Sequence, residues 1–451
     1  MREAIVQRLR LGSPHGRLDP AFYCRRTGLR KLLDDEATRH VPLGDIVAEV
    51  LEGARLPATG MEISLVRLSN LRACEFDSSG LKCVGPHASR SWPHARPGDV
   101  LFARSAAPFR AAVVPAGAPT PLSVSPEITV IRPRGAVVPE YLAALLSTEA
   151  YGRVLRDLSY RRSPTALRRL RLQDIRHLPV PLPGRTLQEE IRAAYESAAR
   201  FSRDSREEIS NVVRAVHSEI DAKISWPEMS HGQLAVRRTE LGDRWDVSYA
   251  KSRLLRATLA QTKVMVPLPT LARPVPSSLR GIGEDDLVLV VKADDINESS
   301  FLVERPMSSP LSALSSRMRQ PLSVGDVLLC TTGEGEQVAY LDNPLASARL
   351  PLLGSATFTA LRFQETPRFY TVALAHPIVR KQIQLLSSGT VQRFVNKRDL
   401  DELLVPSLGS VWREDFDARI DRAMERRREA LTALDRLLDA AQRFVQEGWQ
   451  A

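Results

Sequence analysis

The sequence predicts an α+β protein that contains two copies of one domain, each copy followed by a long helix. Three observations lead to this fold class. Short motifs recur in the same order in both halves of the 451-residue chain. Each half mixes short apolar runs with helical periodicity, and a long stretch with a heptad-like apolar pattern follows each half.

Five pairs of motifs carry the internal repeat. They are 17–23 (RLDPAFY) with 244–249 (RWDVSY), 41–43 with 266–268 (both VPL), 98–102 (GDVLF) with 325–329 (GDVLL), 163–168 (SPTALR) with 388–393 (SGTVQR), and Asp174, Leu178 and 180–181 with Asp399, Leu403 and 405–406. The last four pairs are separated by 225 to 227 residues. A repeat of this length is far longer than a solenoid unit and indicates a domain duplication.

Strands and helices are expected in mixed order within each copy. Apolar and β-branched runs predict strands at 63–68, 128–131, 287–291 and 358–361, and apolar spacing of three and four residues predicts helices at 141–146 and 370–386. The Gly-Asp pairs at 98–99 and 325–326 are typical of turns that lead into buried strands.

A long helix is predicted after the proline-marked end of each copy, at 187–223 and 414–446. The second helix keeps an apolar seam from Ile420 to Val445 that Arg427 interrupts, whereas the seam of the first slips midway. Seams this narrow fit one partner helix. We expect the two helices to form an antiparallel coiled coil that holds the two domains apart. The alternative is that each seam packs on a partner protein.

These features predict four regions. They are a first domain at 1–185, a central long helix at 186–224, a second domain at 225–410 and a distal long helix at 411–451.

The composition favours a cytoplasmic protein with an acidic partner. The formal net charge is +10, with 55 arginines against 8 lysines. Guanidinium groups bind phosphates and guanine edges, which points to nucleic acid, although a GC-rich genome would also explain the arginine excess.

The four cysteines form no C-x-x-C pair and predict no metal site. The sequence lacks a long apolar run and a signal peptide, so we expect no membrane partner.

Signatures of catalysis are missing, and we expect no catalytic residue, metal or cofactor on this chain. The Asn/Asp-Pro-Pro-aromatic loop of amino-methyltransferases and the Gly-Lys-Ser/Thr of a P-loop do not occur. The Gly-x-Gly pieces at 281–283 and 333–335 lack a third glycine. The DAK triplet at 221–223 has the D-x-K spacing found in metal-dependent nucleases. It lies at the end of a predicted helix, however, where a solvent-exposed helix terminus is the simpler interpretation.

The ordered motifs resemble the specificity (S) subunit of Type I restriction-modification systems over essentially the whole chain. The most specific pieces are 244–246 (RWD), 325–328 (GDVL), and 388–392 (SGTVQ) followed by 405–406 (VP). The resemblance implies two target recognition domains and two helices in an antiparallel coiled coil.

The first copy departs from this pattern at three positions. Leu18 stands where the second copy has Trp245, and Pro164 and Leu167 replace the glycine and glutamine of the SGTVQ motif. We therefore expect two domains that share a fold and read different DNA sequences.

The resemblance also implies a function in phage defence. Each recognition domain would read one half of a bipartite target in double-stranded DNA. The helices would dock two DNA methyltransferase (modification) subunits, which would bind S-adenosylmethionine in place of this chain. Restriction subunits with translocase and nuclease activity would be able to join the complex.

DNA contacts are expected from loops between the matched strands and from the polar residues beside them. Arg can pair with guanine, and Gln or Asn with adenine. The candidates in the first copy are Arg67, Asn70, Arg104, Ser105, Arg110, Arg161, Arg162, Ser163 and Arg168. The candidates in the second copy are Lys292, Thr331, Thr332, Thr390, Gln392, Arg393, Asn396 and Lys397. For each of them the alternative is a turn-forming or solvent-exposed role.

Three other hypotheses remain open. The same fold could serve another phage-defence assembly, and a methyltransferase gene next to this one would speak against that. A free-standing DNA-acting enzyme, such as a nuclease, would cleave DNA as the purified chain with a metal ion. A scaffold without a role on DNA would bind no DNA even with its methyltransferase partner.

Overall fold

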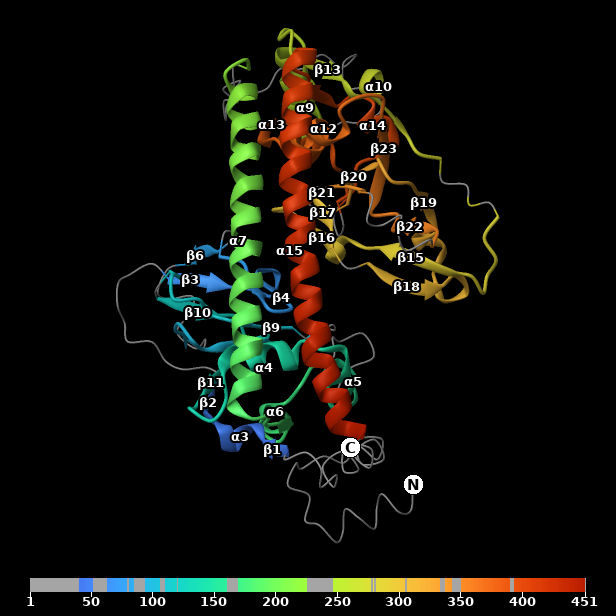
Figure 1. Cartoon of the computed structure of the whole chain (residues 1–451). Helices are drawn as coiled ribbons and strands as arrows, with labels where there is room; N and C mark the ends of the chain where they lie inside the picture. The colour runs from blue at the N-terminus through green and yellow to red at the C-terminus, as the bar shows by residue number, and fades with distance from the viewer. Residues whose placement is uncertain are drawn as a thin grey trace. The chain divides into compact units, whose positions relative to one another are not determined.

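A computed structural model describes residues 40–51, 63–78, 81–84, 94–105, 110–119, 121–159, 169–224, 246–276, 279, 281–304, 306–332, 337–342, 350–389 and 393–450 (Figure 1). The chain divides into two compact units. Unit 1 comprises Met1–Arg203 and Glu429–Ala451, and unit 2 comprises Asp204–Arg428. The long helices α7 (Arg185–Asp221) and α15 (Ser410–Gln450) each contribute one segment to each unit.

Unit 1 combines small β-sheets with short helices. Before α7 its elements are β1 (His40–Pro42), α3 (Leu43–Ile46), β2 (Val47–Leu51), β3 (Ile63–Val66), η1 (Leu68–Asn70), β4 (Leu71–Arg72), β5 (Glu75–Phe76), β6 (Lys82–Val84), β7 (His94–Ala95), β8 (Val100–Ala103), β9 (Ala111–Val113), β10 (Leu122–Val124), β11 (Ile128–Pro133), α4 (Pro139–Leu146), α5 (Glu149–Leu158), α6 (Leu172–Arg176) and β12 (Pro179–Pro181). The sheets have the orders β1-β12, β4-β5, β6-β3-β10-β7 and β2-β11-β8-β9.

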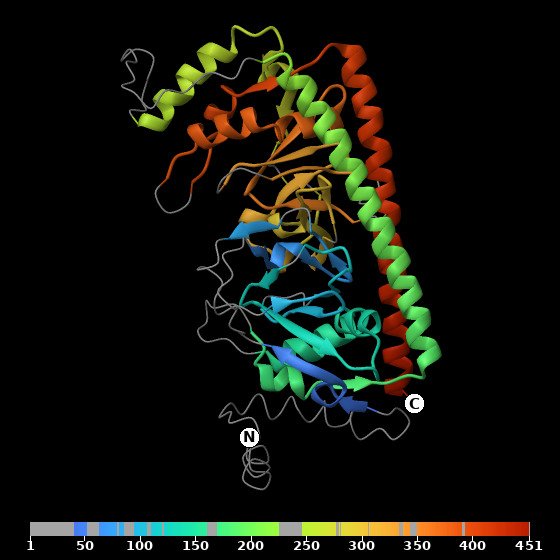
Figure 2. The same cartoon turned by 90° about the vertical axis from the view of Figure 1, so that its left-hand side faces the viewer.

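Unit 2 also mixes short strands with short helices. Before α15 its elements are α9 (Val247–Leu259), β13 (Met265–Pro267), α10 (Leu268–Leu271), β14 (Ala272–Pro274), β15 (Leu287–Val291), η2 (Ala293–Asp295), β16 (Ile296–Asn297), β17 (Leu302–Val303), β18 (Met307–Pro310), η3 (Leu311–Ala313), η4 (Ser316–Met318), β19 (Gln320–Leu322), β20 (Val327–Cys330), β21 (Val338–Tyr340), β22 (Leu352–Gly354), β23 (Phe358–Phe363), α12 (Pro367–Leu374), α13 (Pro377–Leu386), α14 (Lys397–Leu400) and β24 (Leu404–Pro406). Its described residues include the helix α9 and the 3₁₀ helices η3 and η4 in addition. The sheets are β13-β24, β18-β15-β22-β19 and β14-β23-β20-β21-β17-β16. Helix α9 lies beside α13 (Figure 2).

The strand pairings of the two units correspond. Strands β1 and β12 pair antiparallel with Val41 opposite Val180, and β13 and β24 pair antiparallel with Val266 opposite Val405. The parallel pair β3–β10 has its counterpart in β15–β22. The predicted α+β character is confirmed, because both units mix helices with sheets in this way.

One predicted helix is wrong in its extent. The pattern at 370–386 predicts one helix, but the structure has α12 ending at Leu374 and α13 beginning at Pro377. Pro377 has no backbone N–H to donate into a continuous helix, so it begins a new one. The buried side chain of His376 caps α13, because its Nδ1 accepts a hydrogen bond from the Ile378 backbone N at 3.3 Å.

The Gly-Asp motifs place a buried carboxylate at the entrance of a central strand. Asp99 is 1% exposed and pairs with Arg132, with Nε 2.9 Å from Oδ1. Asp326 is fully buried and pairs with Arg362 at the same distance. Each arginine lies on the neighbouring strand, so the ion pair joins β8 to β11 in unit 1 and β20 to β23 in unit 2.

Both long helices pack an apolar face within each unit. In unit 1, Ile191 and Tyr195 of α7 and Leu434 and Leu437 of α15 belong to one buried cluster that continues under α4 and α5. The Tyr195 hydroxyl accepts a hydrogen bond from the Val113 backbone N at 2.9 Å, which attaches α7 to β9.

In unit 2, the other segments of the same helices enter a second buried cluster, with Ile209 and Val216 from α7 and Phe416 and Met424 from α15. The two segments also contact each other through an ion pair in which Arg426 Nη1 lies 2.7 Å from Glu208 Oε2. No helix among the residues that the structure describes is long and apolar enough to cross a membrane.

Candidate nucleic-acid interface

In unit 2 the predicted site residues lie around the end of strand β20. The backbone N–H groups of Thr331 and Val395 donate to the carbonyls of Thr357 and Thr331, respectively, both at 2.9 Å. Ser388 and Phe394 exchange two backbone hydrogen bonds, since Ser388 N donates to Phe394 O at 2.9 Å and Phe394 N donates to Ser388 O at 2.8 Å. Main-chain contacts thus hold Phe394 and Val395 beside the end of β20.

The candidate side chains at the end of β20 differ in their exposure to solvent. Thr331 is buried, and its hydroxyl donates to the Thr357 carbonyl at 3.4 Å. Thr332 is half-buried and forms an isolated bridge with Phe394. Arg393 is exposed and directly precedes Phe394 in the chain.

The start of helix α14 adds polar groups to the same region. Asn396 is exposed at the N-cap of α14, and its Nδ2 donates to Asp399 Oδ2 at 3.5 Å. Lys397 is the first residue of the helix. The structure thus brings together Thr331, Thr332, Arg393, Asn396 and Lys397, whereas Thr390 and Gln392 lie outside the described residues.

Unit 1 has the corresponding arrangement at the end of β8. Ser105 forms an isolated bridge with Arg169, as Thr332 does with Phe394 in unit 2. The Arg169 guanidinium donates to Ser105 Oγ and to the Pro126 carbonyl, both at 3.2 Å. Arg104 is buried and donates from Nε to the same carbonyl at 3.0 Å.

The prediction for this loop named the neighbours of Arg169 and missed Arg169 itself. The residue in the matching bridge of unit 2 is Phe394, which is apolar, so a basic residue at this position does not recur in both halves of the sequence. Arg161, Arg162, Ser163 and Arg168 lie outside the described residues.

A second pair of candidates lies at a short turn that is the same in both units. Arg67 and Lys292 are exposed residues that precede the 3₁₀ helices η1 and η2, with φ of −114° in both and ψ of 169° and 166°. The backbone N–H of Arg67 donates to Asn70 Oδ1 at 2.9 Å, and that of Lys292 donates to Asp295 Oδ2 at 2.8 Å. The turn therefore presents a basic side chain to solvent in each unit.

Two further candidates of unit 1 support this turn from inside. Asn70 is 4% exposed, and its Nδ2 also donates to the Asp77 carbonyl at 3.1 Å. The half-buried Arg110 donates from Nη1 to the Leu71 carbonyl at 3.1 Å. Both side chains are engaged with backbone groups, so they shape the turn that carries Arg67. Sequence reasoning did not find Asp295, which takes the place of Asn70 in unit 2.

The largest pKa shifts belong to buried groups in the cores of the units. Burial raises the pKa of the Tyr151 and Tyr195 hydroxyls well above the usual value. Burial lowers the pKa of His376 to about 4 and also lowers that of His217, whose ring centroid lies 4.8 Å from that of His376. These groups hold helices in place through hydrogen bonds to neighbouring backbone or side-chain atoms.

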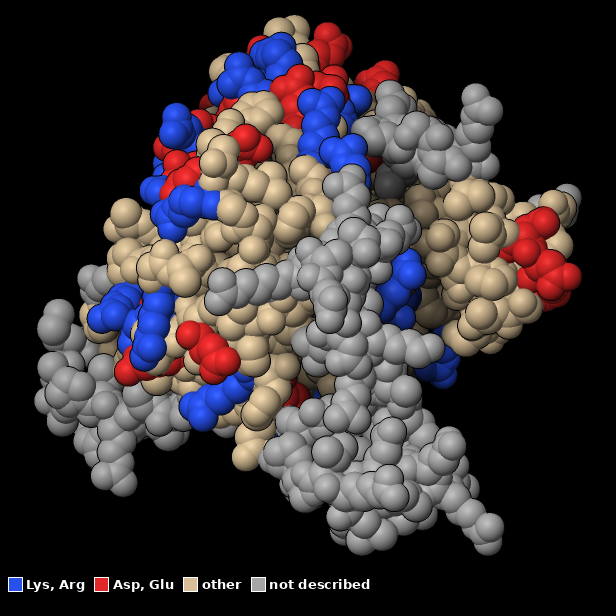
Figure 3. All heavy atoms as spheres, turned by 60° about the horizontal axis from the view of Figure 1, so that its bottom comes forward, with Lys and Arg blue, Asp and Glu red and all other residues tan. Residues whose placement is uncertain are grey.

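The described surface carries both signs of charge and no cluster of metal ligands. Basic and acidic side chains are interspersed on the face drawn in Figure 3. Within the described part of the chain, no three His, Cys, Asp or Glu side chains gather as a metal site would require. Cys74 and Cys330 are buried and Cys83 is exposed, and all three are free thiols.

Comparison with known proteins gives matches among solved structures alone. No protein-family model and no curated protein matches the sequence. The chain is similar to a structure from a study of the complex assembly and conformational transition of the type I R-M system (16% identity, covering 91% of this chain and 97% of that one, TM-score 0.31). It is also similar to the HsdS subunit from Thermoanaerobacter tengcongensis (17%, 92% and 97%, TM-score 0.32) and to the Type I restriction-modification S subunit from M. genitalium (11%, 91% and 98%, TM-score 0.35). All three of these solved structures are described as belonging to type I restriction-modification systems.

Proposed function

We propose that this chain is the DNA-specificity subunit of a Type I restriction-modification complex and that it reads a bipartite target without performing catalysis itself. The observation that carries the proposal is the matched turn of the two units. Arg67 and Lys292 occupy the same exposed position with nearly the same backbone angles. Two basic side chains at equivalent positions of two similar units suit a DNA target with two half-sites.

The loop at the end of β20 would supply sequence discrimination in unit 2. Arg393 is exposed and precedes Phe394, whose backbone is fixed by hydrogen bonds to Ser388, so its guanidinium would be able to pair with a guanine edge or a phosphate. Asn396 lies three residues further along and offers an amide. The buried Thr331 would position this loop and would not contact a base.

The two long helices would hold the recognition units at a fixed spacing. In this proposal the domains are copies of one ancestral domain, with boundaries at 1–185 and 225–410, and α7 and α15 pair in antiparallel orientation. The packing within each unit supports it, because the first part of α7 shares a core with the last part of α15, and the converse holds in unit 2. Two methyltransferase subunits would bind along these helices, and S-adenosylmethionine would bind to them.

Methylome mapping tests the whole proposal. The bases methylated in the source genome are compared with and without this gene. We expect a split motif, two short specific elements separated by a fixed gap, to disappear with the gene. A methylome that is unchanged by the deletion would refute the assignment.

Arg393→Ala tests the reading of one half-site. The complex of the variant chain with its methyltransferase is measured against duplexes that carry substitutions in either half. We expect a loss of about 1–3 kcal/mol and relaxed preference in the second half-site if Arg393 meets a base. A phosphate contact would instead lower affinity for all duplexes equally and reduce the salt dependence. The exposed Lys263, ahead of β13, provides the control variant Lys263→Ala.

A further inference from the structure

Unit 2 presents an aromatic ring to solvent among its polar candidate residues. The side chain of Phe394 is 45% exposed. Within the described part of the chain, Phe394 belongs to none of the buried apolar clusters. Contact of a large apolar side chain with water is unfavourable, so a ligand that covers the outer part of this ring would gain free energy.

The backbone of Phe394 is held in place by its neighbours. Its N–H donates to the Ser388 carbonyl at 2.8 Å, and its own carbonyl accepts the Ser388 N–H at 2.9 Å. Phe394 also forms an isolated bridge with Thr332, and the N–H of Val395 donates to the Thr331 carbonyl at 2.9 Å. A side chain on a fixed backbone loses little conformational freedom on binding, which favours a specific contact.

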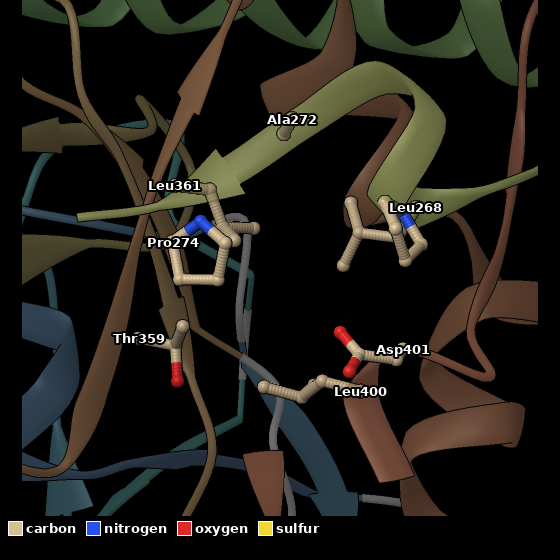
Figure 4. A pocket seen from close by; sticks show the side chains of 8 residues that line it. Leu268, Ala272, Pro274, Thr359, Leu361, Leu400 and Asp401 are labelled. Carbon is tan, nitrogen blue, oxygen red and sulfur yellow. The ribbon is translucent and has the colours of Figure 1, made fainter. Parts of the chain in front are cut away.

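The residues next to Phe394 suit a nucleic-acid ligand. Arg393 before it and Arg398 after it are exposed and basic, and the exposed Asn396 offers an amide. The carboxylate of Asp401, which follows the last residue of α14, points into a hollow beside α10 (Figure 4). Arginine pairs with phosphates or guanine edges and asparagine with adenine edges, so these neighbours would bring Phe394 against the base edges of the major groove.

In unit 1 an arginine takes the place of Phe394. Arg169 forms the isolated bridge to Ser105 there. Its guanidinium donates to Ser105 Oγ and to the Pro126 carbonyl, both at 3.2 Å, so this side chain binds groups of its own unit. An exposed apolar ring at the bridge is therefore particular to unit 2, as expected of a residue that distinguishes one half-site from the other.

We propose that Phe394 packs against the C5-methyl group of a thymine and thereby makes that base a specific element of the half-site that unit 2 reads. The inference rests on the proposed function. Among the base edges in the major groove, thymine alone presents a methyl group, and phenylalanine is one of the side chains that contact it. A phenyl ring forms no hydrogen bond with the polar edge atoms of the other bases, so placing one of them here would remove its water without replacing the lost hydrogen bonds.

Selection from random DNA tests the role of the ring. The complex of the full-length chain with its methyltransferase is mixed with duplexes that carry a random central region, and the bound duplexes are sequenced. We expect the wild type and the control Leu287→Ala, at an exposed apolar residue of β15, to select the same split motif. Phe394→Ala should lose the preference for thymine at one position of one half-site, whereas Phe394→Leu should keep part of it. Because Phe394 lies outside the buried clusters, these substitutions leave the core of unit 2 intact.

Uracil at the same position of a selected duplex then removes the methyl group alone. We expect the wild-type complex to bind the uracil duplex about threefold to fivefold more weakly than the thymine duplex, and Phe394→Ala to bind the two equally. A wild-type complex that selects no motif refutes the proposed function and this inference with it. A motif that Phe394→Ala leaves unchanged refutes the inference alone. Equal binding of the thymine and uracil duplexes by the wild type overturns the methyl group as the contact.

Discussion

The buried arginine in the seam of α15 gives the sharpest test of how unit 2 is held together. Arg427 has no exposed side-chain surface, and its Nε and Nη2 both lie 3.0 Å from Glu304 Oε1. Glu304 also accepts hydrogen bonds from Asn297 Nδ2 at 2.9 Å and Ser300 Oγ at 3.0 Å. Replacing Arg427 by methionine would fill a similar volume and leave the carboxylate buried without its cation.

The expected cost follows from the burial of both partners. Breaking a buried ion pair by removing one side costs about 3–5 kcal/mol, because the remaining charge cannot be hydrated. An exposed ion pair contributes at most about 1 kcal/mol. The adjacent Arg426 is 63% exposed where it pairs with Glu208, so Arg426→Ala is a matched control on the same turn of the same helix.

Hydrogen exchange localises the effect to unit 2. We expect Arg427→Met to lower amide protection in β17 and in the first half of α15 by roughly two to four orders of magnitude, with little change for Arg426→Ala. The double variant Arg427→Met with Glu304→Gln should recover more than half of the loss, since glutamine keeps an acceptor for Asn297 and Ser300 without a charge. If Arg427→Met costs no more than Arg426→Ala, the argument from burial is refuted.

Two further predictions concern pH and a glycine turn. Unit 2 should lose stability as the pH falls from 6.5 toward 4, because burial lowers the pKa of His376 to about 4 and also lowers that of His217. In that window the unfolded chain binds protons that the folded chain does not, and His376 alone would account for a loss of about 2 kcal/mol at pH 5 relative to pH 8. Urea unfolding of the wild type and of His376→Gln at the two pH values measures this loss. An equal change in the free energy of unfolding between pH 8 and pH 5 in both proteins would contradict the prediction. Gly325→Ala should cost about 1–2 kcal/mol, because Gly325 has φ of +92° and no atom lies within 4 Å of the added Cβ, so that backbone strain is the whole effect. Exchange of the β20 amides measures this cost, and Gly117→Ala, which also meets no atom within 4 Å, is its control; equal effects of the two substitutions would disprove the role of φ.

Local sequence patterns predicted individual strands and turns well. The apolar run at 287–291 is β15 with the same bounds, and the Gly-Asp motifs do precede buried strands. Periodicity alone could not show the break at Pro377, because the apolar spacing continues across it. Helix α15 runs from Ser410 to Gln450, beyond the predicted 414–446, and at its start the exposed Val411 and Trp412 do not continue the buried apolar seam.

The candidate site was less accessible from sequence, because side-chain direction depends on the fold. Arg67 and Asn70 are both polar residues of one turn and could not be told apart as candidates from the sequence. In the structure Arg67 is exposed, whereas Asn70 is buried within the turn. Arg427 stood out as an interruption of an apolar seam, but its partner Glu304 lies 123 residues away and on an unrelated element. Whether Arg393 or Lys292 meets a base stays a prediction.

The discontinuity of unit 1 has a consequence for folding during synthesis. Unit 2 is one continuous stretch from Asp204 to Arg428, whereas the core of unit 1 includes Leu434, Leu437 and Ala441. A ribosome that adds about 5–20 residues per second completes the sequence of unit 2 before these residues emerge. Unit 1 is therefore translated first and completed last, and until α15 has been synthesised its core lacks the side chains of Leu434, Leu437 and Ala441. We expect the nascent chain to expose this part of the unit 1 core after the whole of unit 2 has been translated.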